Sequence, residues 1–201
     1  RLHGARQLSG DGMGALDLFR VGKLAEIGLA DVLDDRGPLH PAFAGLVRPS
    51  EGTVFVGDTD LASADEATRT ALRLHTTGMV FQDSNLIAQF TALENVEFIL
   101  RCQGFPHPRP VARALLDGLG VGDLADRLPT AMSGGQRQRV AVARALAGNR
   151  RLIMCDEPTG ALDTDNARHL FSALALLAVQ ENVAVLVATH DQEGREHAHR
   201  V

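Results

Sequence analysis

Two adjacent carboxylates, Asp156 and Glu157, follow a short apolar run in the stretch RLIMCDEPTGALD. Such a run predicts a buried strand, and its end would place both acids at the carboxyl edge of a parallel sheet, where α/β proteins bind ligands. Neighbouring strand residues point to opposite faces, so the two acids need not share a role. One is suited to a hydrated Mg²⁺ and the other to orienting water as a general base. A solvated strand end before a Pro-Thr-Gly turn is the structural alternative.

A second candidate is the run Ser133-Gly134-Gly135-Gln136, which precedes a strongly helical stretch. Small residues at a helix N-terminus leave backbone N–H groups accessible, and the positive end of the helix dipole favours an anion. A serine N-cap followed by two loop glycines is the structural alternative. Taken alone, this run does not decide between the two.

Gln82 and His190 each follow a short apolar stretch, GMVF and VLVAT respectively. A glutamine there can reach a metal-bound water, and a histidine can donate to a phosphate oxygen. Each one alone is more often an ordinary polar strand end. Together with Ser133 and the Asp156–Glu157 pair, they predict one site at one edge of a sheet.

The elements that must position these residues alternate between short apolar strands and helices. This alternation predicts an α/β fold with a largely parallel sheet covered on both faces. Strands are expected within PSEGTVFVGDTDL, TGMVFQD (ending at Gln82), RLIMCDEP and VAVLVATH. Helices are expected after Ser63 and Thr91, each with a glutamate in capping-box spacing, and over 111–119, 135–147 and about 165–180. Pro106–Pro110 is expected to be a loop, and LAEIGLADVLDD near the N-terminus reads as a weak helix.

The bulk composition narrows the class of protein. The chain has 201 residues, 45% of them hydrophobic, and a net charge of -5, which fits one globular domain. Without a basic patch, nucleic acid is not expected as a partner. No secretion signal or apolar stretch of ~20 residues is evident, so a cytoplasmic chain is expected. The two cysteines, Cys102 and Cys155, lie in apolar sequence without metal-like spacing, and we expect both to be reduced.

These stretches resemble the nucleotide-binding subunits of ATP-binding cassette (ABC) transporters. MSGGQ matches the family signature, usually LSGGQ, and LIMCDE matches its Walker B strand. Gly160–Asp163 matches the D-loop, Gln82 the Q-loop and His190 the switch histidine. MVFQDSNLIAQFTALENV and DEPTGALD are similar to the branch that serves lipoprotein release and macrolide export by MacB-like permeases.

The resemblance implies a P-loop NTPase-like ABC domain with a helical subdomain at about 83–147 and a largely parallel sheet core. It covers residues 42–192 of a single domain spanning 1–201, and residues 1–41 are atypical and degenerate. The implied cofactors are ATP and Mg²⁺. The implied location is the cytoplasm, peripheral on the inner face of the cell membrane.

The resemblance also implies roles for the site residues. Asp156, and Gln82 through water, would attend Mg²⁺, while Glu157 would polarise the attacking water. His190 would contact the γ-phosphate.

Other implied contacts lie between subunits. Ser133 and Gln136, with the backbone of Gly134 and Gly135, would bind the γ-phosphate of the other subunit's ATP in a head-to-tail homo- or heterodimer. Asp163 would lie at the dimer seam. The segment from Gln82 to Pro110 would dock on a membrane-spanning permease subunit.

One part of the family pattern is missing. A phosphate loop has the form G-x-x-x-x-G-K-[ST], because its lysine and hydroxyl bind phosphate and Mg²⁺. Counting back from Ala44–Leu46 places Arg36 at the lysine position and Asp35 at a glycine position, and Gly37-Pro38 occupies the hydroxyl positions. The Walker A residues therefore remain unassigned.

Three hypotheses stay open. The chain is an active ABC-type ATPase subunit, or a catalytically impaired partner that completes the site of an intact sister subunit, or a truncated remnant. The change from unpatterned to patterned sequence near Gly45 motivates the third.

The absent lysine and hydroxyl predict weak or no ATP binding by the isolated chain. Equilibrium titration with ATP and Mg²⁺ measures this affinity. Micromolar binding that survives Arg36→Ala would contradict the prediction.

Overall fold

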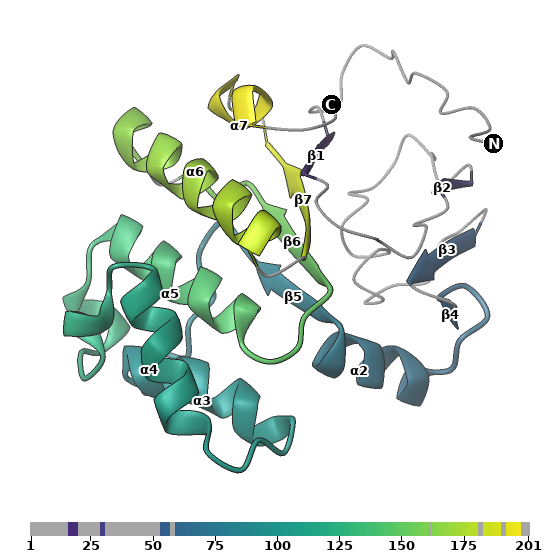
Figure 1. The fold of residues 1–201 in the computed structure, drawn as a ribbon, viewed down its shortest axis with the longest axis horizontal. Helices are drawn as coiled ribbons and strands as arrows, with labels where there is room; N and C mark the ends of the chain where they lie inside the picture. Colours follow the sequence, from purple (N-terminus) through teal and green to yellow (C-terminus); the bar gives the residue numbers. More distant parts are fainter. Residues whose placement is uncertain are drawn as a thin grey trace.

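The computed structural model describes residues 16–19, 29–30, 53–56, 59–160, 162–180, 183–189 and 192–197 (Figure 1). Its main sheet has the strand order β1 (Leu16–Phe19), β7 (Ala184–Ala188), β6 (Leu152–Asp156), β5 (Thr77–Val80). β5, β6 and β7 are parallel, and β1 pairs antiparallel with β7. A smaller antiparallel sheet contains β2 (Leu29–Ala30), β3 (Thr53–Val56) and β4 (Thr59–Asp60). The predicted largely parallel sheet is confirmed, with one antiparallel strand at its edge.

The strand register brings the ends of the three parallel strands to one edge. Val80 of β5 pairs with Cys155, and Asp156 of β6 pairs with Ala188. Residues that follow these strands therefore emerge side by side, although they are far apart in the chain. This edge is where the sequence predicted the site.

The core explains why β6 and β7 read as continuous apolar runs. Ile153, Met154 and Cys155 of β6 are buried, as are Val185 and Val187 of β7. Helices α6 (Thr164–Gln180) and α5 (Gly134–Leu146) pack beside the sheet, near β7 and β5 respectively. Strands buried on both faces carry no polar alternation.

A group of helices lies to one side of the sheet (Figure 1). It consists of α3 (Ala92–Cys102), α4 (Pro108–Gly118) and α5, joined by the short helices η1 (Gly122–Leu124) and η2 (Pro129–Ala131). The three long helices contact one another and share a core that includes Val96, Leu100, Ala112, Leu116 and Val140. This group occupies the segment predicted to be the helical subdomain.

Helix α3 begins as its sequence predicts. The Glu94 N–H donates to the Thr91 hydroxyl at 3.2 Å, and the Thr91 N–H donates to the Glu94 carboxylate at 2.8 Å. Both bonds are local, so sequence spacing is sufficient to specify them.

The start of α2 (Glu66–His75) differs from its prediction. Its N-cap is Asp65, whose carboxylate accepts from the Thr68 N–H at 2.8 Å. Ser63 instead donates its hydroxyl to Asp60 at 2.9 Å. The predicted cap is wrong because the preceding turn engages the Ser63 hydroxyl.

Four further sequence expectations need correction. α4 begins at Pro108, inside the predicted loop, because a proline fits the first turn of a helix, where its missing N–H costs no bond. β5 ends at Val80, two residues before Gln82. Leu29–Ala30 forms a strand within the predicted weak helix, since pairing with β3 overrides a weak local preference. Cys102 is exposed near the end of α3, whereas Cys155 is buried.

Gly78 lies where β5 packs closely on α5. A Cβ added there would lie 2.0 Å from the Ala145 carbonyl oxygen and 2.7 Å from Ile153 Cδ1. A backbone oxygen cannot move aside as a flexible side chain can, so the close packing of β5 on α5 requires glycine.

We predict that Gly78→Ala destabilises the fold by about 1–3 kcal/mol or more through overpacking. Thermal unfolding measures the loss as a lower Tm. Gly118→Ala is the matched control, since a Cβ there meets nothing within 4 Å. Equal Tm values for the two variants would contradict the packing of β5 against α5.

Candidate functional site

Asp156 and Glu157 lie at the carboxyl end of β6, as predicted. They are not successive strand residues, however, because β6 ends at Asp156 and Glu157 has φ 44°. The Glu157 N–H still donates to the Ala188 carbonyl at 2.9 Å, which attaches the turn to β7. The two acids are therefore not related by strand alternation, because the backbone changes direction at Glu157. A left-handed conformation at a non-glycine residue costs about 1–3 kcal/mol and is found mainly where function requires it.

Thr189 is a site residue that sequence reasoning missed. Its hydroxyl donates to Glu157 Oε2 at 3.2 Å, and its side chain is buried. It immediately follows β7, so it reaches Glu157 across the sheet edge. Its position between an apolar strand and His190 was the available signal.

Gln82 joins the same edge from β5. A Cβ added to Gly160 would lie 2.9 Å from Gln82 Nε2, so the Gln82 side chain packs on the turn after Glu157. That turn is closed by the Gly160 N–H, which donates to the Glu157 carbonyl at 3.1 Å. The structure thus brings the Gln82 side chain to the segment that carries the acids.

Two predicted parts of the site lie outside the described residues. These are His190 and the region around Arg36, where a phosphate loop was sought. Their roles stay predictions.

Ser133 is the N-cap of α5, which confirms the structural alternative for its hydroxyl. The expectation of two loop glycines is wrong, because Gly134 and Gly135 form the first turn of the helix. Ser133 Oγ accepts from the Gln136 N–H at 3.3 Å, and Gln136 Oε1 accepts from the Ser133 N–H at 2.9 Å. This capping box does not engage the N–H groups of Gly134 and Gly135. In the first turn of a helix such groups have no carbonyl acceptor within the helix. The positive end of a 13-residue helix therefore keeps two small residues at its start.

Asp163 directly precedes α6. Its carboxylate accepts from the Asn166 N–H at 2.8 Å, and this hydrogen bond is the main reason that the pKa of Asp163 is lowered. The start of α5 lies beside it: a Cβ on Gly135 would be 3.4 Å from Leu162 Cδ2 and 3.9 Å from the Asn166 side chain. The start of α5 therefore packs against Leu162 and Asn166, which lie before and in the first turn of α6.

The donors at the sheet edge suit Mg²⁺ better than a tightly chelated metal. Asp156 and Gln82 offer oxygen ligands, and Mg²⁺ in nucleotide sites takes one or two protein oxygens and keeps several waters. Within the described ranges, no group of three or more His, Cys, Asp or Glu is placed to hold a metal ion.

No helix in the part of the chain that the structure describes is long and apolar enough to cross a membrane.

A parallel sheet edge that carries these acids, with a capped helix start nearby, is typical of α/β domains that bind ligands at the carboxyl ends of their strands. The sequence profile of the family described as ABC transporter matches residues 39–160, more than half of the chain. The chain belongs to the ABC transporter family. The predicted family and fold class are confirmed.

The chain is similar to curated members of this family. It is 42% identical over 161 residues to the lipoprotein-releasing system ATP-binding protein LolD 2 of Caulobacter vibrioides, covering 79% of this chain and 71% of that one. It is 41% identical over 153 residues to LolD of Nitrobacter hamburgensis, covering 75% and 66%. It is 42% identical over 158 residues to the macrolide export ATP-binding/permease protein MacB of Rhodospirillum rubrum, covering 78% and 24%. The chain thus spans about two thirds of the LolD relatives and a quarter of MacB.

Solved structures of ABC transporter cassettes have a similar fold. A dimeric structure of MJ0796, a bacterial ABC transporter cassette, has a TM-score of 0.72 at 35% identity, covering 79% of this chain and 71% of that one. A dimeric post-hydrolysis state of MJ0796 bound to ADP and Pi has a TM-score of 0.73 at 30% identity, covering 92% and 91%.

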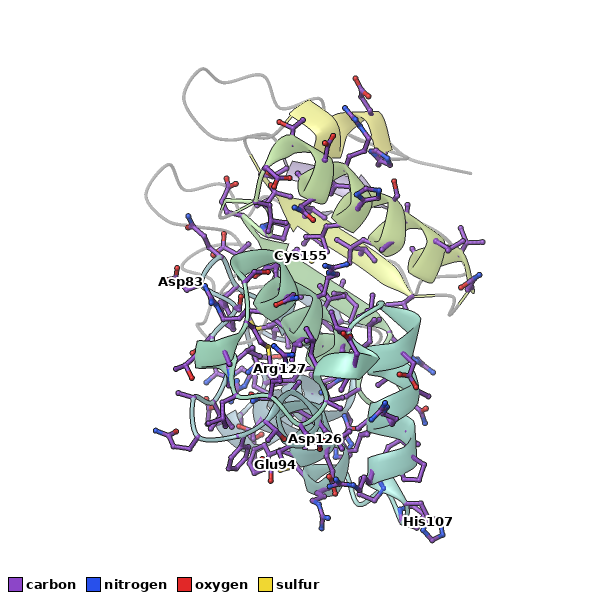
Figure 2. All side chains as sticks on the ribbon, turned by 90° about the vertical axis from the view of Figure 1, so that its left-hand side faces the viewer. Asp83, Glu94, His107, Asp126, Arg127 and Cys155 are labelled. Atoms are coloured by element: carbon purple, nitrogen blue, oxygen red, sulfur yellow. The ribbon has the colours of Figure 1, made fainter. Side chains whose placement is uncertain are left out.

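Cys155 lies in the interior, directly before Asp156 (Figure 2). Burial, and secondarily the Asp156 charge, raises the pKa of its thiol to about 12. The thiolate is the reactive form of cysteine, and at pH 8 it would be only about one part in 10⁴ of a thiol with this pKa. Cys155 is therefore a packing residue rather than a nucleophile.

We predict that one of the two thiols reacts rapidly in the native chain at pH 8, and both in denaturant. Thiol titration with a chromogenic disulfide counts them. Cys102→Ser should remove the fast phase and Cys155→Ser should keep it. Two fast thiols in the native protein would contradict the burial of β6.

Proposed function

We propose that this chain is the ATP-binding subunit of an ABC transporter, coupling ATP binding and hydrolysis to export or to lipoprotein- or macrolide-type extrusion by a membrane permease. The observation that carries the proposal is the arrangement at the sheet edge, where Thr189 orients Glu157 and Gln82 packs on the turn that follows it. The LolD and MacB relatives support the class of cargo.

In this proposal the edge residues have distinct tasks. Asp156, and Gln82 through water, would hold Mg²⁺, which would neutralise phosphate charge when bound. Glu157 accepts a hydrogen bond from the attacking water, and the Thr189 hydroxyl keeps its carboxylate in one orientation. His190 contacts the γ-phosphate of ATP.

The start of α5 serves the sister subunit. Ser133 and the N–H groups of Gly134 and Gly135 would bind the γ-phosphate of the sister's ATP, because a helix N-terminus with small residues attracts phosphate. Gln136 keeps this helix start in shape through its bond to the Ser133 N–H. Asp163 would then lie at the seam of a homo- or heterodimer, and the dimeric MJ0796 structures support such an assembly.

A surface hollow on the helical group supports permease docking and peripheral attachment to the membrane. Phe98 is 42% exposed and makes an edge-to-face contact with Phe90 at a centroid distance of 5.8 Å. The hollow is lined by Phe90, Glu94, Glu97, Phe98, Arg101 and Arg109. Exposed aromatic rings ringed by charged groups are typical of protein interfaces. Figure 2 labels Glu94, one of these residues, in the helical group.

A second candidate function is a catalytically impaired partner. It is favoured by one observation, the DDRGP sequence (34–38) where a lysine and a hydroxyl belong. In this case the chain supplies the start of α5 to a site whose phosphate loop comes from an intact sister.

We predict that Ser133 is required when this chain completes a sister's ATP site. The test mixes the chain with a LolD-type subunit that has an intact phosphate loop but an arginine in place of its own signature serine. The only complete site then combines the sister's loop with this chain's α5. Ser133→Arg should lower the ATPase rate by at least about tenfold, as expected when phosphate-binding donors are lost.

Ala114→Arg, on an exposed face of α4, is the control and should keep the rate. An unchanged rate in Ser133→Arg would overturn the proposal. A second mixture distinguishes the active subunit from the impaired partner. It uses a sister subunit whose catalytic glutamate is replaced by glutamine, so that only this chain can supply an active site. Activity that disappears with Glu157→Gln supports an active site in this chain, and no activity supports the impaired partner.

A further inference from the structure

The turn that follows β5, residues 81–86 (here called the β5 turn), has an uncommon backbone. Ser84 has φ 61° and Asn85 has φ 45°, so two successive non-glycine residues are left-handed. Asparagine tolerates this conformation better than serine does. Such a pair persists only when its surroundings over-determine it.

Gln138 of α5 is hydrogen-bonded to the first part of this turn. Gln138 is 3% exposed. Its Oε1 accepts from the Ser84 hydroxyl at 2.7 Å, and its Nε2 donates to the Phe81 carbonyl at 3.2 Å. Both ends of the amide are therefore used to bridge Phe81 and Ser84.

Arg144 of α5 is hydrogen-bonded to the left-handed residues Ser84 and Asn85. The Arg144 guanidinium donates to the Ser84 carbonyl at 2.9 Å and to the Asn85 carbonyl at 2.6 Å. These two bonds need the planar fork of arginine, which a lysine cannot reproduce.

Asn95 of α3 holds the chain beyond the turn. It is fully buried, and its Oδ1 accepts from the Ile87 N–H at 2.8 Å. Its Nδ2 donates to the carbonyls of Ile87 and Phe90 at 3.1 Å each. The segment from Ser84 to Phe90 is thereby attached to the helical group, whereas the neighbouring Gln82 and Asp83 are exposed. Asp83 is labelled in Figure 2.

We propose that Gln138 and Arg144 are positioning residues that lock the β5 turn to α5, so that Gln82 and the Ser133 end of α5 move as one unit. Gln82 packs on Gly160 beside the chain's own acids, while Ser133 heads the helix proposed to meet the sister's nucleotide. This inference rests on the proposed function for the roles of Gln82 and Ser133.

The locking itself is tested on the full chain alone. Gln138→Met keeps volume and removes both hydrogen bonds, and Arg144→Lys keeps the charge but loses the fork. We expect the backbone amides of residues 84–87 to exchange hydrogen at least about tenfold faster in each variant, with the amides of β6 unaffected. Unchanged exchange in the turn would overturn the proposal, whatever the ATPase result.

The matched control is Gln103→Met. Gln103 also donates from its amide to a backbone carbonyl of another element, that of Leu74, but it does not touch the β5 turn. We expect it to leave exchange at residues 84–87 unchanged.

Measuring kcat and KM in the mixture with the LolD-type subunit distinguishes a positioning role of Gln138 from an effect on protein stability. Gln138→Met should lower kcat at least about fivefold and leave the KM for ATP within about twofold, since the sister's loop binds the nucleotide. Ser84→Ala should lower kcat less, and should add nothing in the Gln138→Met background, because the two residues share one bond. Gln103→Met should keep kcat.

If Gln103→Met lowers kcat as much as Gln138→Met does, the effect is one of stability and the positioning role is wrong. If the unmodified mixture is inactive, the proposed function fails, and the exchange experiment still decides whether the turn is locked.

Discussion

The parallel pairing of β5, β6 and β7 is the constraint on which the rest of the site depends. Parallel strands end at the same edge, so the residues that follow Val80, Asp156 and Ala188 emerge together. The pairing requires helices on the faces of the sheet, which is why the interior of these strands is mainly apolar and Cys155 is a buried thiol with a raised pKa. Polar chemistry is therefore confined to the turns beyond the strands.

Two of those turns are strained, and each is held by side chains from elsewhere. Glu157 has a left-handed backbone and accepts a bond from Thr189. Ser84 and Asn85 are left-handed and are held by α5. In both cases a conformation that is unfavourable in isolation is maintained by the neighbouring element. The position of each turn therefore depends on a second element.

The accuracy of the sequence predictions follows the range of the interactions. The Thr91 capping box and the Ser133 cap were predictable because both bonds span three residues. The cap of α2 was misassigned, because the turn before it captures Ser63. The strand at Leu29–Ala30 depends on a partner more than twenty residues further along, Val54 and Thr53, so local pattern could not reveal it.

By itself, the sequence determined the α/β class, the acid pair at the end of β6, the capped start of α5 and the ABC family. These are carried by contiguous residue patterns and by single local bonds. Only the tertiary structure decided that Thr189 orients Glu157, that Gln82 packs on Gly160, and that Gln138 holds Ser84. Those contacts join residues 32, 78 and 54 positions apart (189 − 157, 160 − 82, 138 − 84). Their partners are chosen by strand register and helix packing, which no local stretch of sequence encodes.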